Sequence, residues 1–236
     1  ALRWRSGGLT THGYREFFAV GVAAAVSQAA ESGAFGGMTI LAGRLGGQAV
    51  AGYQIALSLL SVVFMCSLGM ASATAVLAAR ELGRRDGQNA ALRVSWVGLV
   101  CTTGVMLCIA VLLLLWPRPI AQAYTVAQDI ATVVVILMPL VASAVIVDGG
   151  QVVASAALRA LSDNWFPTAS HLLAYALVMP GVAFFLAEIH GFGVRGLLLA
   201  VNVASVLSVG VLMLRLWALT RRAPAQQAQA NPHETS

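Results

Sequence analysis

Charged residues are scarce in this chain: Asp, Glu, Lys and Arg together make up 10% of its 236 residues, and lysine is absent. Hydrophobic residues make up 59%, and the mean hydropathy is +0.83. A soluble domain normally carries about 25% charged residues, so this composition excludes that class and indicates an integral membrane protein. The few basic residues show no aromatic interleaving or groove-binding motif, and we therefore expect no nucleic-acid partner.

Cysteine is also rare, and Cys66, Cys101 and Cys108 all fall in apolar segments. None of them has a CxxC or Cys/His spacing, so we interpret them as packing residues and expect neither a disulfide framework nor a metal site. His171 and His190 lack the HExxH spacing of zinc proteases, and no acid lies beside Glu31 to form a catalytic pair. The sequence therefore predicts a protein that is not an enzyme and has no cofactor.

Six apolar runs divide the chain, and each is long enough to cross about 30 Å of hydrocarbon. They cover residues 17–43, 49–79, 94–116, 127–158, 166–187 and 192–219. Transmembrane barrel strands alternate polar with apolar residues in short segments, which these runs do not. We predict an all-α membrane protein with a lead-in at 1–16, six transmembrane helices within 17–219, and a disordered tail at 220–236 that is rich in Pro, Gln and Ala.

Arginine placement predicts the orientation in the membrane lipid, because cytoplasmic loops hold an excess of Lys and Arg. Three arginines fall on one side of the predicted helices: Arg44, Arg118 and Arg195. Eleven fall on the other side: Arg3, Arg5, Arg15, Arg80, Arg84, Arg85, Arg93, Arg159, Arg215, Arg221 and Arg222. Both termini are therefore expected in the cytoplasm.

Two acids lie inside the apolar runs, Glu31 in the first and Asp148 in the fourth. A carboxylate at mid-membrane costs about 2.5 to 3.5 kcal/mol on insertion scales, and such residues usually mark ion or substrate pathways. In a low-dielectric cavity a deprotonated Glu31 or Asp148 would attract a cationic substrate or a coupling ion. The alternative is that each acid merely pairs with a neighbour such as Gln28 or Gln151.

Polar side chains accompany both acids at helical spacing. Gln28 shares a helical face with Glu31, and Gln54 and Ser58 recur at the same interval in the second run. Asp148 is followed at offsets of 3, 7 and 11 by Gln151, Ser155 and Arg159, within a narrow arc of one helix that Pro139 is expected to kink. We expect these residues to line a polar path, although interhelical hydrogen bonding alone would produce the same pattern. His171 and Tyr175, four residues apart, are interpreted as a structural pair rather than a proton relay.

Four stretches resemble the multidrug and toxic compound extrusion (MATE) transporters, NorM-like branch, and specifically the carboxy-terminal half of such a protein. They are residues 31–35 (ESGAF), 41–56 (LAGRLGGQAVAGYQIA), 68–87 (LGMASATAVLAARELGRRDG) and 147–167 (VDGGQVVASAALRALSDNWFP). The last resembles the family's tenth helix and the cytoplasmic loop after it, which would contain Arg159 and Asp163. The resemblance implies a six-helix lobe of a twelve-helix fold, in a bacterial cytoplasmic (inner) membrane, with a missing amino-terminal six-helix lobe as partner.

That resemblance aligns Glu31 and Asp148 with the acids that bind the coupling cation, so it implies an antiporter that exports cationic or amphipathic organic compounds in exchange for H+ or Na+. Several positions depart from the family pattern: Ala23 replaces a Pro, Ala144 a Tyr, Ala156 and Ala160 two Gly, and Arg195 a Trp. Without the Tyr, one oxygen ligand of a sodium site is missing, which favours protons slightly. Two alternatives stay open, a lipid-linked oligosaccharide flippase of the same superfamily and a non-transporting scaffold subunit.

Overall fold

The computed structural model describes residues 11–84 and 87–230, and every regular element in them is helical. The long helices are α1 (Thr11–Arg44), α2 (Gly47–Leu82), α3 (Gly87–Leu115), α5 (Gln128–Ala160) and α8 (Val194–Ala230), with a short α4 (Pro117–Tyr124) between α3 and α5. A sixth rod is continuous but changes helix type along its length. It comprises α6 (Trp165–His171), the π-helix η1 (Leu172–Val178), α7 (Met179–Phe184) and the π-helix η2 (Phe185–Ile189).

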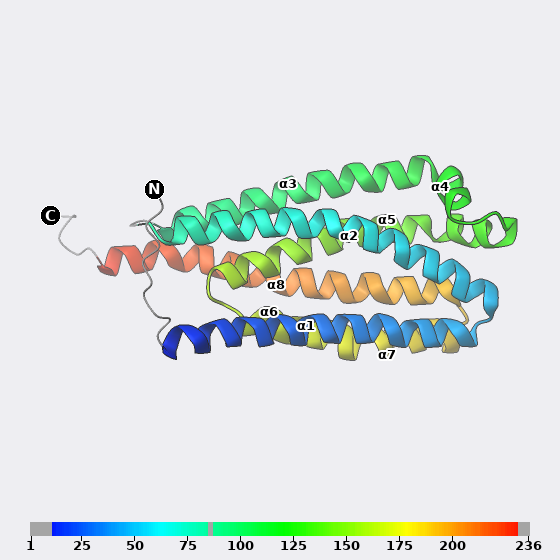
Figure 1. The fold of residues 1–236 in the computed structure, drawn as a ribbon, viewed down its shortest axis with the longest axis horizontal. Helices are drawn as coiled ribbons and strands as arrows, with labels where there is room; N and C mark the ends of the chain where they lie inside the picture. The colour runs from blue at the N-terminus through cyan, green and yellow to red at the C-terminus, as the bar shows by residue number, and fades with distance from the viewer. Residues whose placement is uncertain (1–10, 85–86, 231–236) are drawn as a thin grey trace.

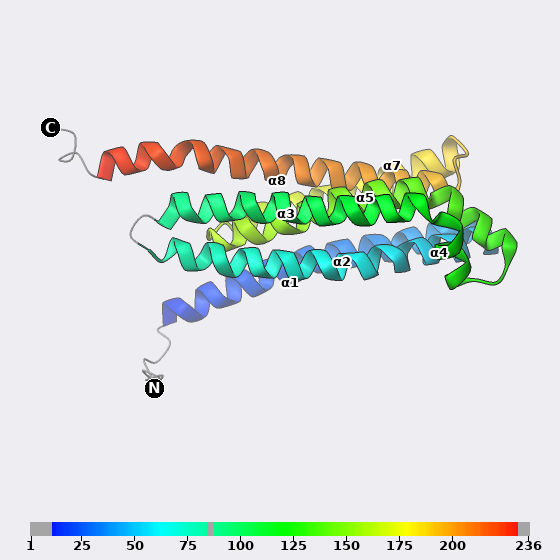
Figure 2. The same ribbon diagram turned by 90° about the horizontal axis from the view of Figure 1, so that it is seen from above.

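The six rods run alongside one another in one elongated bundle, as Figures 1 and 2 show. The end of α2, the start of α3 and the loop from α5 to α6 lie at the same end as the first residues of α1, while α4 and the loop from α1 to α2 lie at the other end (Figure 1). Many large hydrophobic side chains on the outside are bare, including Val76, Val100 and Leu177 at 68%, 68% and 69% exposure. Such a surface suits hydrocarbon rather than water.

Five of the described rods are long and apolar enough to span a membrane: α2, α3, α5, the α6 to η2 rod, and α8 as far as Arg221. The first predicted span, α1, has 34 residues but is not among the five. Its polar residues, Gln28 and Glu31 among them, lower its mean hydropathy. It nevertheless runs along the bundle beside the others, so the predicted six-helix lobe is observed with a more polar first helix (Figure 1).

Helix ends differ from the predicted boundaries. α1 begins at Thr11, within the predicted lead-in, and α8 continues to Ala230, through most of the segment expected to be a disordered tail. Ala and Gln are good helix formers, which explains how the end of α8 extends past the apolar run. Residues 231–236 lie outside the described part of the chain, as do Arg3, Arg5 and Arg85 of the topology prediction.

α5 is the centre of the bundle, because α2, α3 and α8 all pack against it. Leu137, Met138 and Val141 are each 1% exposed and form the middle of its core. Next to Asp148, Gly149 lets α3 approach closely, since a Cβ atom there would lie 2.5 Å from Cγ of Met106. Gly149 therefore permits close packing of α3 against α5 beside Asp148.

A second close approach joins the start of α8 to the end of the preceding rod. A Cβ atom on Gly196 would lie 2.8 Å from the backbone nitrogen of Ala187. A Cβ atom on Gly181, in contrast, would meet no heavy atom within 4 Å. The two glycines therefore differ in packing although both lie in helices.

We predict that Gly196→Ala lowers the free energy of unfolding by about 1 to 3 kcal/mol, because the added methyl group meets rigid backbone. Gly181→Ala is the matched control and should leave stability unchanged or raise it by up to about 1 kcal/mol, since alanine favours helix. Thermal unfolding in detergent would compare the two variants. Equal melting temperatures for both would contradict the predicted contact.

Candidate functional site

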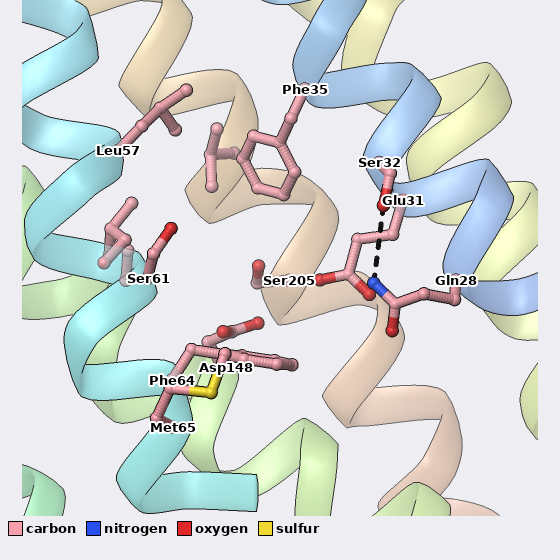
Figure 3. Close-up of a pocket in the computed structure, with 13 residues that line it drawn as sticks. Gln28, Glu31, Ser32, Phe35, Leu57, Ser61, Phe64, Met65, Asp148 and Ser205 are labelled. Atoms are coloured by element: carbon pink, nitrogen blue, oxygen red, sulfur yellow. Dashed lines mark hydrogen bonds between the residues drawn. The ribbon is translucent and has the colours of Figure 1, made fainter.

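A cavity of about 400 Å³ lies between α1, α2, α5 and α8. Figure 3 shows its lining residues, which the four helices share. α1 supplies Gln28, Glu31, Ser32 and Phe35; α2 supplies Leu57, Leu60, Ser61, Phe64 and Met65; α5 supplies Ala144 and Asp148; and α8 supplies Val201 and Ser205. The wall on α2 is mostly apolar and the wall on α1 carries the amide and carboxyl groups, so the cavity is amphipathic.

Glu31 and Asp148 point into this one cavity from different helices (Figure 3). They are far apart in the sequence, and the fold brings these two predicted candidates to one cavity. Within the described part of the chain the Glu31 carboxylate has no hydrogen-bond partner, whereas it interacts electrostatically with Asp148 and with Arg159. Glu31 therefore carries unused acceptor capacity toward the cavity. Gln28 lies beside it and donates from Nε2 to Oγ of Ser32 at 3.4 Å.

The hydroxyl of Tyr175 lies 3.5 Å from Oδ1 of Asp148 and can donate to it. That hydroxyl also lies 3.1 Å from Oε1 of Gln151 and 3.0 Å from Oγ of Ser205. Neither Tyr175 nor Ser205 was predicted from the sequence as a site residue. The helical spacing of His171 and Tyr175 was the available signal, and it could not show that their common face meets α5.

The polar stripe after Asp148 does not continue along the cavity. Gln151 is 1% exposed, and its Nε2 lies 3.2 Å from Nε2 of His171. Ser155 is 4% exposed and donates to the carbonyl of Val152 at 3.0 Å. Among these residues only Asp148 lines the cavity.

Gln54 and Ser58 of α2 also lie off the cavity. Both are exposed, and Gln54 donates to Oγ1 of Thr39 at 3.2 Å, which joins α2 to α1. Ser61, less than one turn after Ser58, is the α2 hydroxyl that lines the cavity. The α2 wall of the cavity is therefore lined at Ser61 and not at Gln54 or Ser58.

Arg159 and Asp163 lie at the end of the bundle where α5 turns into α6. Arg159 belongs to the last turn of α5 and donates to Oγ of Ser27 at 3.0 Å. Asp163 lies between the helices and accepts from Nε of Arg215 at 2.8 Å. Arg159 therefore links α5 to α1, and Asp163 links the loop after α5 to α8.

Metal-binding geometry is not found in the described residues, where no three His, Cys, Asp or Glu side chains gather closely enough to hold an ion. The three cysteines are free and exposed on the outside of the bundle. The cavity offers two carboxyl groups, the Gln28 amide and a few hydroxyls. Reversible binding of a proton or a cation is the chemistry that this donor set permits.

Comparison with known proteins gives concordant results. The family model MatE matches residues 23–185. A relative from Caulobacter vibrioides, a probable multidrug resistance protein NorM, is 37% identical over 198 residues, which are 83% of this chain and 41% of that protein. A probable multidrug resistance protein NorM from Deinococcus radiodurans is 34% identical, over 78% of this chain and 42% of its own length. The chain thus spans less than half the length of these relatives.

Solved structures match the fold at low sequence identity. A crystal structure of the eukaryotic MATE transporter AtDTX14 superposes with a TM-score of 0.80 at 20% identity, covering 93% of this chain and 51% of that one. An outward-facing MATE transporter of the MOP superfamily gives a TM-score of 0.83 at 16% identity, with 93% and 50% coverage.

The helical bundle therefore has the fold of one lobe of the solved MATE transporters. The family match extends over most of that bundle. This chain belongs to the MatE family.

Proposed function

We propose that the chain forms the carboxy-terminal lobe of a secondary antiporter in a bacterial cytoplasmic membrane. The transporter would export cationic or amphipathic organic compounds in exchange for H+ or Na+. The observation that carries the proposal is that Glu31 and Asp148 face one cavity although they come from α1 and α5. Curated relatives described as probable multidrug resistance proteins support the same assignment.

The cavity suits a cation that also carries apolar surface. Phe35 and Phe64 line it together with both acids, so an organic cation could contact an aromatic face while its charge approaches a carboxylate. A proton or sodium ion would compete for the same negative charge. Because binding of one cation disfavours the other, the site provides the exchange that antiport requires.

The oxygen atoms that line the cavity favour H+ over Na+ as the coupling ion. Ala144 lies on the cavity wall one turn before Asp148 and supplies no oxygen. A sodium ion needs several oxygen ligands at once, whereas a proton needs one carboxylate. We therefore propose H+ as the coupling ion, with Na+ as the alternative.

The described lining of the cavity contains no arginine, which favours the antiporter over the flippase alternative. A site for a lipid-linked pyrophosphate would place guanidinium groups in the cavity, since these bind phosphate strongly. Arg159 instead bonds Ser27 outside the cavity lining. As partner we propose an amino-terminal lobe, since the chain matches about half the length of the solved transporters.

We predict that Asp148→Asn abolishes ion-driven export by the full-length transporter while membrane insertion stays normal, because the amide keeps the size and removes the charge. Glu31→Gln should do the same or raise the ion concentration needed. Export measured in proteoliposomes under separate proton and sodium gradients tests both variants and the coupling ion. Gln54→Ala is a suitable control, since Gln54 is exposed and does not line the cavity.

Wild-type export by both Asp148→Asn and Glu31→Gln would remove the two acids from the mechanism. Export driven by sodium alone would keep the acids and overturn the preference for protons.

The orientation predicts which loops face the cytoplasm. Arg84, in the loop after α2, should be labelled from inside the cell when replaced by cysteine, and Val126, which is 96% exposed before α5, only from outside. The loops that hold these two positions lie at opposite ends of the bundle (Figure 1). A membrane-impermeant maleimide applied to a cysteine-free background measures this, and outside labelling of position 84 would reverse the assignment.

A further inference from the structure

The Tyr175 hydroxyl is fully buried and has three acceptors within reach. They are Oδ1 of Asp148 at 3.5 Å, Oε1 of Gln151 at 3.1 Å and Oγ of Ser205 at 3.0 Å. A phenol has one proton, so it can donate to only one of them at a time. The choice depends on which acceptor is the strongest.

Donation toward Gln151 fits the observed distances, because its Oε1 lies nearer to the hydroxyl than Oδ1 of Asp148 does, at 3.1 Å against 3.5 Å, and Ser205 can itself donate to the phenol oxygen. Once Oε1 of Gln151 accepts from Tyr175, the amide nitrogen Nε2 is the atom that faces His171, at 3.2 Å. An amide nitrogen only donates, so Nε2 of His171 must accept and the neutral imidazole must carry its proton on Nδ1. That Nδ1 atom is buried and has no partner among the described residues.

A charged Asp148 would change this choice. Hydrogen bonds to an ionised carboxylate are roughly twice as strong as neutral ones, so the Tyr175 proton would turn toward Asp148. Gln151 would then lose its donor and gain by turning its amide over, which presents Oε1 to His171. The imidazole would carry its proton on Nε2. One proton leaves Nδ1 and one joins Nε2 by exchange with water, so the ring stays neutral.

We infer that Tyr175 is a positioning residue that transmits the charge state of Asp148, through Gln151, to the tautomer of His171. The consequence reaches the contact between α5, α1 and α6, because Arg159 acts electrostatically on His171 and also bonds Ser27. Nε of Arg159 and Nδ1 of His171 are both buried and have no described hydrogen-bond partner. Moving the ring proton to Nε2 would turn Nδ1 of His171 from a donor into an acceptor.

The position of Tyr175 in the chain fits this role. It lies in the π-helix η1, directly after the α6 helix that ends at His171, and π-helical turns occur frequently at functional sites. The charged and titratable groups around the cluster are Glu31 from α1, Asp148 and Arg159 from α5, and His171 from α6. From α8 the neutral Ser205 faces Tyr175. Asp148 is the titratable group that contacts the Tyr175 hydroxyl directly.

The experiment is nitrogen-15 NMR of histidine-labelled full-length transporter in lipid, which distinguishes the two neutral tautomers and the doubly protonated ring. The chain has four histidines, and the His171 signals are assigned by their loss in His171→Asn. As the pH of the wild-type sample is raised, the proton should move from Nδ1 to Nε2 when Asp148 becomes charged. Asp148→Asn should keep the Nδ1–H tautomer throughout, because its charge never appears.

Tyr175→Phe keeps the ring and removes the hydroxyl, so the His171 tautomer should no longer follow Asp148. Tyr53→Phe is the matched control: Tyr53 is also fully buried, but its hydroxyl has no described partner, and the tautomer change should persist. A tautomer change that survives in Tyr175→Phe, or a His171 ring that is doubly protonated in the wild type, would overturn the inference.

The inference rests on the proposed function only where it concerns transport. A second measurement distinguishes failure of the hydrogen-bond relay from failure of the proposed function. If the proposal holds, Tyr175→Phe should uncouple export from the ion gradient while substrate binding stays within about twofold of wild type. Ion-driven export that is unchanged in Tyr175→Phe would overturn the role in coupling even if the tautomer responds. Absence of a tautomer change in the wild type, with export that still depends on Asp148, would overturn the relay and leave the proposed function standing.

Discussion

The free-energy cost of placing a carboxyl group between apolar helices governs the middle of this bundle. Each buried acid needs donors, a cation or a proton, and the fold supplies these unequally. Asp148 has the Tyr175 hydroxyl near it, whereas Glu31 has no hydrogen-bond partner within the described chain. The unequal supply makes Glu31 the more open acceptor and Asp148 the acid that is connected to the rest of the core.

Close helix packing keeps water away from one side of Asp148, so hydration there does not lower the free-energy cost of burying its carboxyl group. α5 packs against α2, α3 and α8, and small residues next to the acid permit this approach. Gly149 is the clearest case, because any side chain there would meet Met106. The same packing leaves the opposite side of Asp148 open to the cavity. One face of the acid is therefore fixed by the protein and the other is free for a ligand.

Much of this arrangement could be predicted from the sequence, because apolar run lengths and intramembrane acids are strong signals. The helices and the choice of Glu31 and Asp148 as candidate site residues followed from those signals, and the structure places both acids in one cavity. The other lining residues were harder to predict from the sequence. Four candidates share helical faces with cavity residues but do not line the cavity: Gln54, Ser58, Gln151 and Ser155. Helical spacing gives an angle around one helix, and it does not say which neighbouring helix lies at that angle. Tyr175 was missed for the same reason, because its partners belong to α5 and α8.

The π-helical stretch η1 constrains how the chain can change in length during evolution. A π-turn holds one more residue than an α-turn, so it is equivalent to a single-residue insertion that a helix has absorbed. Deleting one residue between 172 and 178 would return the rod to α-helical phase and rotate one part of it against the other by about 100°. The part of the rod after the deletion would then present a different face to α1 and α8, which pack against it. The length of the chain at this point should therefore be inherited more strictly than the identities of its residues.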